Sequence, residues 1–370
     1  MNSARLGLLA VLVLAACEQP TAVTGGNSTG IRFLAEGASD GFARALTARP
    51  FVFPQDHGSH PEYRTEWWYF TGNLFSAESR HYGFELTFFR IALNPVAIQR
   101  ASAWGANQVW MGHFALTDTA NGRFSAAERL SRGALGLAGA NATPLRVWVE
   151  DWHVAEDNAG TLRLAATMPE GALDLELKAL KAPVPQGIDG LDPKGPEAGN
   201  ASYYYSVPRL AASGTVRTAD ETSEAVQGLA WMDREWGTSA LSPGVAGWDW
   251  FALQLSDGRD LMFYRLRGRD GSTSPFSGGT LIGADGERRV LAADDVALEV
   301  RRWWTSPASR ARYPVAWRLV LGEISLDIEP VLPQQELDLS VRYWEGAVKI
   351  EGGEGALSLT GNGYLELAGY

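Results

Sequence analysis

The sequence predicts an all-β protein, built as sandwiches or barrels, and three observations support this class. Apolar and polar residues alternate with a period of two over 173–178 (LDLELK) and 324–328 (ISLDI), which is the pattern of half-buried strands. Glycine is abundant, with 41 residues, and turn dipeptides such as Asn121-Gly122 separate the strand-like segments. Long amphipathic helical stretches are scarce, so helices are not expected to form the core.

Composition and charge exclude several classes of function. Of the 370 residues, 45% are hydrophobic and 20% are charged, which is typical of a globular protein rather than a disordered one. The formal net charge is -11 and no Lys/Arg-rich run is present, so we expect no nucleic-acid partner. The single Cys excludes internal disulfides and Cys-ligated zinc. The 14 Trp residues predict aromatic-lined interiors or clefts.

The first 17 residues predict a bacterial lipoprotein signal peptide. Arg5 and the free amine precede an apolar run over 6–16, which is too short to span a bilayer. Small residues then lead into Cys17, so we expect Cys17 to be lipidated and to become the new N-terminus; an ordinary cleaved signal with an incidental Cys is the alternative. Residues 18–30 are polar and predict a flexible tether. The expected location is the cell envelope, lipid-anchored at the periplasmic face of the outer membrane.

Two similar aromatic hairpins indicate an internal duplication. An aromatic strand, a turn and a second aromatic strand ending in Arg and an aliphatic residue occur over 68–91 and again over 248–266. Chance similarity between hairpins is the alternative. Because the polar segment 218–225 resembles a turn, we place one domain at 31–224 and a second at 225–370.

The first candidate site is the segment 57–70, which ends in four consecutive aromatics. On a strand, Glu66 and Trp68 share one face, while Trp67 and Tyr69 share the other. Burial beside indoles would raise the pKa of Glu66 and make it a candidate general acid. The alternative is a structural Glu that pairs with Arg64 or with backbone amides.

The second candidate site is the segment 231–237 (WMDREWG), in which three charged residues lie between two Trp. Such charges are expected to be partly buried and therefore paired. Arg234 could bind a carboxylate and stack on Trp236. In a functional interpretation, Asp233 or Glu235 points into a pocket. In a structural interpretation, a buried ion network locks the two domains together.

Two further aromatic motifs add candidates. In the segment 247–251 (GWDWF), Asp249 points away from Trp248 and Trp250, so it faces solvent or pairs with Arg234. Tyr205 ends a run of three Tyr, which could line the mouth of a ligand site or lie on an exposed strand edge.

Motifs for nucleophilic, phosphate-binding and metal-dependent chemistry are absent from the sequence after the predicted tether. Residues 31–370 contain no Gly-x-Ser-x-Gly, no phosphate-binding Gly loop and no His-Glu-x-x-His, and no His follows residue 153. A Ser-His-Asp site confined to the second half is therefore excluded. His57, His60 and Glu66 could together bind a metal, but such groupings are common by chance and we expect no metal.

Five aromatic motifs resemble those of the lipocalin-like carotenoid 1,2-hydratase (hydroxyneurosporene synthase) family. The resemblance is strongest to its secreted branch, whose members are often called predicted secreted hydrolases or transporter-associated lipoproteins. It covers about residues 50–370 in order. The motifs are His60-Pro-x-Tyr-Arg-x-Glu-Trp-Trp-Tyr-Phe-Thr-Gly72, Trp231-Met-Asp-Arg-Glu-Trp-Gly237, Gly247-Trp-Asp-Trp-Phe251, Tyr343-Trp-Glu-Gly346 and Gly363-Tyr-Leu-Glu-Leu-x-Gly-Tyr370.

The resemblance implies two lipocalin-like antiparallel β-barrel domains side by side, an apolar ligand and no cofactor. In the hydratase branch, water adds across the terminal double bond of an acyclic carotenoid. This chemistry needs an acid, aromatic faces that stabilise a carbocation, and a base. Arg234 stands where that branch is expected to carry a His, and arginine does not exchange protons near neutral pH.

We therefore expect a membrane-anchored protein that binds an apolar, lipid- or isoprenoid-like molecule, with an export-type transporter as a candidate partner. The alternative is a hydratase, isomerase or hydrolase that uses Glu66, Asp233 and Glu235 as acid–base groups. A structural partner that docks through its aromatic surface is a third hypothesis. The candidate ligand-contacting residues are His60, Trp67, Trp68, Tyr69, Tyr205, Arg234, Trp236, Trp248 and Asp249.

Overall fold

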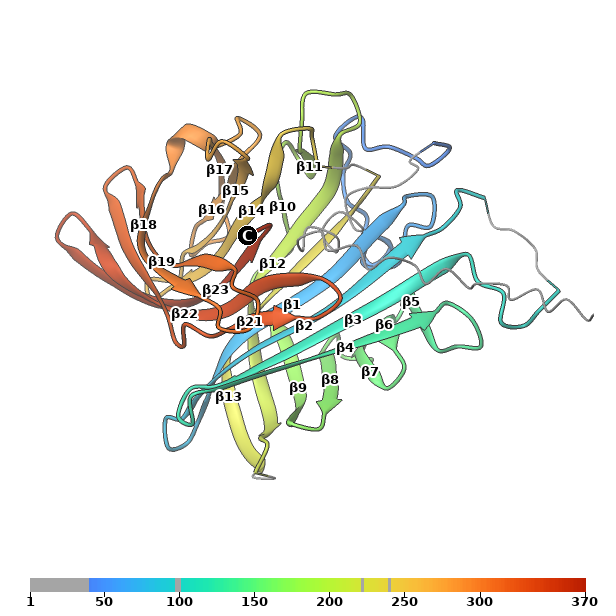
Figure 1. Ribbon diagram of the computed structural model, residues 1–370, viewed down its shortest axis with the longest axis horizontal. Coiled ribbons are helices and arrows are strands. Elements are labelled where there is room, and N and C mark those ends of the chain that lie inside the picture. The colour runs from blue at the N-terminus through green and yellow to red at the C-terminus, as the bar shows by residue number, and fades with distance from the viewer. Residues whose placement is uncertain (1–39, 97–100, 221–222, 239–240) are drawn as a thin grey trace, which may run out of the picture.

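The structure is a computed structural model that describes residues 40–96, 101–220, 223–238 and 241–370, and it confirms the all-β class (Figure 1). In these ranges the helices are two short 3-10 turns, η1 (Gln55–His57) and η2 (Ala293–Asp295). No helix of the described residues has the length and apolarity needed to cross a membrane. The predicted signal peptide and tether, including Cys17, lie outside the described residues.

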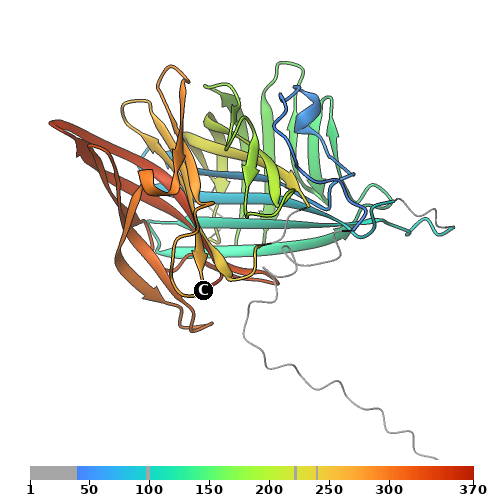
Figure 2. The ribbon, with the colours of Figure 1, turned by 90° about the horizontal axis from the view of Figure 1, so that it is seen from above.

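The first sheet is antiparallel, contains 13 strands and curls into a near-closed barrel (Figures 1 and 2). Its order is β4-β3-β2-β1-β13-β12-β9-β8-β7-β6-β5, and two short strands pair with β12 beside this path. The strands are β1 (Thr65–Ser76), β2 (His81–Ala92), β3 (Gln108–Asp118), β4 (Arg123–Arg132), β5 (Ala138–Ala142), β6 (Leu145–Val149), β7 (Trp152–Glu156), β8 (Leu162–Met168), β9 (Gly171–Ala179), β10 (Val184–Pro185), β11 (Leu191–Pro193), β12 (Ala201–Arg217) and β13 (Ser223–Gly237).

The second sheet is also antiparallel, contains 10 strands and forms a half-barrel beside the first (Figures 1 and 2). Its order is β17-β16-β15-β14-β23-β22-β20-β19-β18, with β21 pairing with β22. The strands are β14 (Val245–Leu255), β15 (Asp260–Gly268), β16 (Gly278–Ile282), β17 (Arg288–Ala292), β18 (Ala297–Thr305), β19 (Arg312–Leu321), β20 (Ile324–Pro330), β21 (Glu336–Asp338), β22 (Arg342–Glu354) and β23 (Leu357–Ala368).

The two sheets follow the same path. Each pairs its first strand with its last, β1 with β13 and β14 with β23, and each continues outward from its first strand in consecutive hairpins. The two aromatic hairpins noted in the sequence are β1–β2 and β14–β15, which occupy the same place in the two sheets. The predicted domain boundary at residues 224/225 lies within β13, whereas the chain passes from the first sheet to the second after Gly237.

Alternation along the strands divides apolar side chains between the barrel interiors and the contact between the sheets. Large buried aromatics such as Trp68 and Trp110 fill the first barrel, and Trp317 and Trp344 fill the second. The opposite faces of β1, β2 and β13 pack against β14, β22 and β23. A Cβ atom on Gly83 would lie 2.5 Å from the Cβ of Ala347, so glycine at this position permits the close approach of the two sheets.

A buried ion cluster joins the two halves at the start of β15. The carboxylate of Asp260 is fully buried and accepts hydrogen bonds from Lys181 Nζ at 2.7 Å and from Arg209 at 2.7 Å. Lys181 also donates to the carbonyl oxygens of Gly258 and Gly283. Because Lys181 follows β9 and Arg209 belongs to β12, this cluster fixes the first sheet against the second.

Candidate functional site

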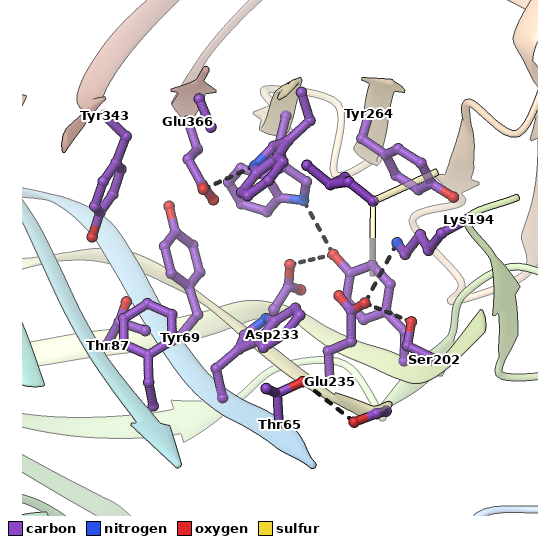
Figure 3. A pocket seen from close by; sticks show the side chains of 18 of the residues that line it. Thr65, Tyr69, Thr87, Lys194, Ser202, Asp233, Glu235, Tyr264, Tyr343 and Glu366 are labelled. Atoms are coloured by element: carbon purple, nitrogen blue, oxygen red, sulfur yellow. Dashed lines mark hydrogen bonds and ion pairs between the residues drawn. The ribbon is translucent and has the colours of Figure 1, made fainter. Parts of the chain in front are cut away.

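A pocket lies between the two sheets and encloses about 1250 Å³ of empty space, counting the part at its mouth that is open to solvent (Figure 3). Strands of both sheets build its walls, and its lining is rich in aromatic rings. The aromatic residues are Trp67, Tyr69, Phe89, Tyr204, Trp248, Trp250, Tyr264 and Tyr343, and the carboxyl groups are those of Asp233, Glu235, Glu345 and Glu366.

The period of two decides which side chains of β1 and β13 enter the pocket. On β1, Trp67 and Tyr69 face the pocket, whereas the flanking Trp68 faces the interior of the first barrel. On β13, Asp233 and Glu235 face the pocket. Adjacent residues of one strand therefore belong to two different environments.

Asp233 lies on the wall formed by the first sheet and is held by three donors. Its carboxylate accepts hydrogen bonds from Trp231 Nε1 at 2.6 Å, from Ser206 Oγ at 2.5 Å and from the Tyr204 hydroxyl. Burial raises the pKa of Asp233 to about 7, although the three hydrogen bonds favour the charged form and oppose this rise. Asp233 can therefore exchange a proton near neutral pH.

Glu235 lies farther along the same wall, beside the cation of Lys194. Lys194 Nζ is 3.4 Å from Glu235 and 2.5 Å from Asp192, and Ser202 Oγ donates to Glu235 at 2.5 Å. Although burial acts to lower it, the two carboxylates hold the pKa of Lys194 above its usual value. Burial raises the pKa of Glu235, and the charge of Lys194 counteracts that rise. This end of the pocket is thus a paired ionic cluster.

Glu366 enters the pocket from the second sheet, on the wall opposite Asp233 (Figure 3). Its carboxyl group accepts one hydrogen bond, from Trp248 Nε1 at 2.9 Å. Burial raises the pKa of Glu366 to about 8, and the nearby charges of Glu235 and Asp233 add to the rise. Glu366 is only half-buried, so its carboxyl group can reach a ligand and is predominantly protonated near neutral pH.

Two further carboxyl groups lie near Glu366. Glu345 lines the pocket, is fully buried and accepts a hydrogen bond from the Tyr69 hydroxyl at 2.9 Å. Glu85, on β2, is fully buried as well and lies beside the Thr87 hydroxyl of the same strand. Burial raises the pKa of both groups well above the usual carboxyl value.

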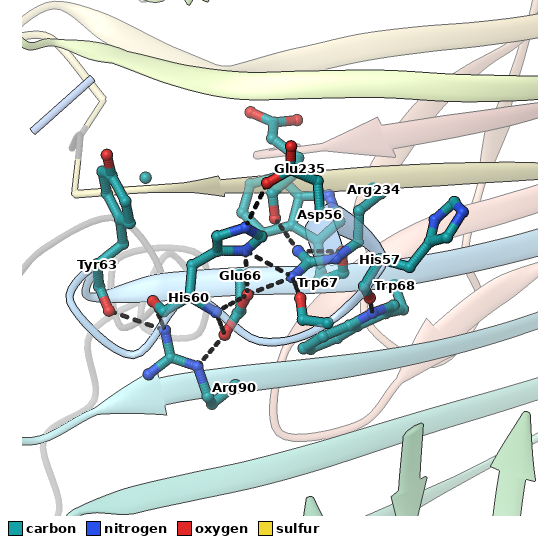
Figure 4. Close-up of polar contacts among 12 residues, drawn as sticks. Asp56, His57, His60, Tyr63, Glu66, Trp67, Trp68, Arg90, Arg234 and Glu235 are labelled. Carbon is teal, nitrogen blue, oxygen red and sulfur yellow. Dashed lines mark hydrogen bonds and ion pairs between the residues drawn. The ribbon is translucent and has the colours of Figure 1, made fainter. Parts of the chain in front are cut away.

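Glu66 does not line the pocket, and the expectation of a raised pKa is wrong for it. Its fully buried carboxylate is ion-paired with Arg90 and Arg234 in the first barrel, and it accepts hydrogen bonds from the backbone N–H of His60 at 3.0 and 3.1 Å (Figure 4). Although burial acts to raise it, Arg234, Arg90 and His60 hold the pKa of Glu66 well below its usual range. Glu66 is thus a permanent carboxylate, paired with these arginines rather than with Arg64, and cannot act as a general acid.

The residues around Glu66 share its location inside the first barrel. The His60 ring stacks on Trp236 with 3.9 Å between centroids, and the Arg234 guanidinium lies 3.8 Å from the centre of the Trp68 ring. The Tyr205 hydroxyl lies 2.6 Å from His57 Nδ1. None of these side chains lines the pocket, unlike Trp67, Tyr69 and Trp248. A ligand contact of His60, Trp68, Tyr205, Arg234 and Trp236 therefore stays a prediction that this pocket does not support.

Asp249 neither faces solvent nor pairs with Arg234, contrary to expectation. It is fully buried on the interior face of the second sheet. Its carboxylate accepts hydrogen bonds from Arg265 at 2.6 and 2.8 Å and from the Tyr370 hydroxyl at 2.5 Å. It therefore occupies a place like that of Glu66, opposite an Arg on the neighbouring strand of the hairpin, and does not line the pocket.

The candidate residues that sequence reasoning missed come mainly from the second sheet. Glu345 and Glu366 lie within the aromatic motifs 343–346 and 363–370, but they are not among the site residues predicted from the sequence. A signal for both was present, because each is an isolated carboxylate among apolar residues of a strand. For Lys194, in a Pro- and Gly-rich loop, the sequence carries no such signal.

Comparison with known proteins relates this chain to one family and to a named enzyme. A family model described as AttH-like matches residues 44–370. The crystal structure of a Nitrosomonas europaea protein described as an AttH is 35% identical, with a TM-score of 0.79, and covers 89% of this chain and 100% of that one. Kievitone hydratase of Fusarium solani subsp. phaseoli is 25% identical over 244 residues, which are 63% of this chain and 68% of that enzyme.

The fold is also shared with a solved hydratase. The crystal structure of kievitone hydratase from Nectria haematococca superimposes with a TM-score of 0.67 at 17% identity, and covers 89% of this chain and 96% of that one. At this level of identity the similarity shows the common fold.

Proposed function

The chain belongs to the AttH-like family, and we propose that it is a hydratase or dehydratase, a lyase that adds water to or removes water from an apolar substrate held between its two sheets. The observation that carries this proposal is the placement of Glu366 and Asp233 on opposite walls of one aromatic pocket. The pKa values of these two carboxyl groups, about 8 and about 7, suit proton transfer near neutral pH.

In the hydration direction, the carboxyl group of Glu366 gives its proton to one carbon of the double bond, and the π electrons form the new C–H bond. The other carbon becomes a carbocation, which the faces of Trp67, Trp248 and Trp250 stabilise. A water oxygen forms the C–O bond and loses a proton to the carboxylate of Asp233. Proton exchange with solvent then restores both groups, and dehydration follows the same steps in reverse.

Three findings support an enzyme over a simple carrier. One relative that matches by sequence, kievitone hydratase, is named a hydratase. The resemblance to the carotenoid 1,2-hydratase family implies the same class of reaction. The pocket supplies an acid and a base on separate walls, in place of the His that the hydratase branch is expected to carry near Arg234. The carboxylate candidates are therefore Glu366 and Asp233, with Glu235 beside them.

The test is isotope incorporation from solvent. The purified protein is incubated with a panel of apolar alkenes and tertiary alcohols in H2¹⁸O and D2O, and products are analysed by mass spectrometry. We expect incorporation of ¹⁸O and deuterium into at least one substrate, and loss of both in Glu366→Gln and Asp233→Asn. Equal incorporation by the wild-type protein and both variants would refute the proposal.

Binding of an apolar ligand without turnover is the second candidate, and the aromatic lining of the pocket favours it. Native mass spectrometry of the purified protein would then show a bound lipid or isoprenoid that the Glu366→Gln variant retains. Turnover that depends on Glu366 would exclude a purely binding role.

We also propose that the protein is lipid-anchored in the cell envelope through Cys17, the single Cys of the chain. Labelling cells with a radioactive fatty acid should mark the wild-type protein. A Cys17→Ser variant should lose the label and leave the membrane fraction. Labelling that persists in this variant would contradict the anchor.

A further inference from the structure

We propose that the end of the pocket lined by Glu345 and Glu366, with Glu85 buried nearby and here called the glutamate end, binds a cationic group, so that the ligand is an apolar molecule carrying an ammonium group. This proposal rests on the proposed function only in placing the ligand in the same pocket. It concerns what the pocket recognises, whereas the proposed function concerns proton transfer.

Unpartnered polar atoms mark the glutamate end as a binding site. Glu345 is fully buried and lines the pocket, and its Oε1 has no hydrogen-bond partner among the described residues. The buried hydroxyl group of Tyr364, on β23, also has no partner among the described residues. Buried polar groups without partners are rare in folded proteins, because each has lost its water without compensation. A ligand that reaches this end of the pocket would supply the missing partner.

The expected charge of the missing partner comes from a comparison with the three other carboxyl groups that have no exposed surface in the described residues. Glu66, Asp249 and Asp260 are all fully buried, and each is paired with at least one Lys or Arg. The described residues provide no such cation for Glu85, Glu345 or Glu366.

The two ends of the pocket differ in this respect. At the opposite end, Lys194 is a cation that neutralises Asp192 and Glu235 (Figure 3). At the glutamate end, three carboxyl groups from β2, β22 and β23 have no such partner within the described ranges, so burial and their mutual proximity keep them protonated until an entering cation displaces a proton. The positive charge is therefore expected to come from the ligand.

The aromatic rings at the glutamate end favour an organic cation. Tyr69 and Trp248 line the pocket and hydrogen-bond with Glu345 and Glu366, respectively. Tyr343 lies on the same side of the pocket as Glu366 (Figure 3). Aromatic faces attract alkylammonium groups through the ring quadrupole, and they also accept the methyl groups of such cations as apolar surface. Carboxylates together with aromatic rings thus form a site for a substituted ammonium group attached to an apolar body.

The experiment compares ligands of one shape and different charge. Benzyldimethylammonium, whose N–H can donate to a carboxyl oxygen, its neutral isostere isobutylbenzene, and the anion phenylacetate are titrated into the purified protein and followed by calorimetry. We expect the cation to bind about tenfold more tightly than the isostere, and the anion not to bind. Equal or tighter binding of the neutral isostere would overturn the proposal.

Variants locate the site. Glu345→Gln and Glu85→Gln each replace one buried carboxyl group by an amide of the same size. Each variant should bind the cation about fivefold more weakly and bind the neutral isostere as tightly as the wild type does. The control is Glu351→Gln, which removes an exposed carboxyl group from β22, the strand of Glu345. This variant should bind both ligands with the wild-type affinity. If a variant lost the same factor of affinity for the cation and for the neutral isostere, the site would not be specific for charge. Because only binding is measured, the outcome does not depend on turnover.

Discussion

Trp248 donates to Glu366 the one hydrogen bond that this carboxyl group accepts within the described part of the chain, with 2.9 Å between the indole nitrogen and the carboxyl oxygen. Asp233, on the facing wall, accepts three hydrogen bonds. Hydrogen-bond donors favour the charged form of a carboxyl group. In the proposed hydration, this difference favours Glu366 as the acid and Asp233 as the base.

Replacing Glu366 by Gln should reduce turnover by a factor of roughly 10² to 10⁴, the usual contribution of a general acid. The amide keeps the shape of the side chain but has no proton to give at neutral pH. The rate is measured as solvent-isotope incorporation into the substrate. Glu351→Gln, an exposed change on β22, is the control and should retain the wild-type rate. A Glu366→Gln protein with full activity would remove Glu366 from the mechanism.

The rate of hydration should show a bell-shaped dependence on pH. Activity requires an ionised Asp233, whose pKa is about 7, and a protonated Glu366, whose pKa is about 8. We therefore expect the maximum between these two values, with the rate falling as pH decreases below the first and increases above the second. A rate that stays constant from pH 5 to pH 10 would be incompatible with this pair (the range is chosen to extend about two units beyond each limb).

Tyr204→Phe should shift only the acidic limb of that profile. The Tyr204 hydroxyl donates to Asp233 and thereby lowers the pKa of Asp233, so its removal should raise this pKa and move the acidic limb to higher pH. The basic limb, which reports Glu366, should stay in place. The measurement is the pH dependence of the rate for both proteins. Movement of the basic limb alone would show that the two limbs are assigned to the wrong groups.

Glu66→Gln should destabilise the fold by about 3–5 kcal/mol, because it leaves Arg90 and Arg234 buried without their carboxylate. The free energy of unfolding is measured by denaturant titration. Glu176→Gln, an exposed change on β9, is the matched control and should stay within about 0.5 kcal/mol of the wild type. A small effect of Glu66→Gln would mean that the arginines find other partners.

The same ion cluster predicts how stability depends on pH. The pKa of Glu66 is lower in the folded protein than its ordinary value, so its contribution to stability is present above the unfolded-state value of about 4.3 and decreases as the pH falls below it. The Glu66→Gln variant should lack this part of the acid dependence. Parallel acid unfolding curves for the two proteins would contradict the assignment.

Asp260→Ala should loosen the junction between the sheets. It leaves Lys181 and Arg209 without their shared buried carboxylate, which is expected to cost about 3 kcal/mol. The readouts are the free energy of unfolding and limited proteolysis between residues 238 and 245. Asp257→Ala, which removes a more exposed partner of Arg259, should cost about 0.5 kcal/mol or less. Equal effects of the two changes would show that the buried cluster does not hold the sheets together.

The separation of neighbouring residues onto two faces could be predicted, because side chains alternate along a strand. Trp67 and Trp68 lie on opposite faces of β1, as the strand pattern predicts. Which face would meet a ligand could not be predicted in this way. Both faces of β1 carry aromatic rings, and both become buried, one inside the barrel and the other against the second sheet.

The pKa of Glu66 shows the same limit more sharply. The sequence indicated a carboxylate among indoles, for which burial alone predicts a raised pKa. Strand pairing places Arg90 directly opposite Glu66 on β2, and it brings Arg234 beside it from β13. These two charges outweigh burial and reverse the direction of the shift. The residues next to Glu66 in the sequence do not reveal these two arginines, because strand pairing brings them from other parts of the chain.

By itself, the sequence determined the all-β class, the aromatic hairpins that begin each sheet and the candidacy of Asp233 and Glu235, since these depend on periodicity and composition within short segments. Only the tertiary structure decided that Glu366 faces Asp233 across a pocket, while Glu66 and Asp249 pair with arginines inside the two barrels. The physical reason is that the environment of a carboxyl group depends on which distant strands pack against it.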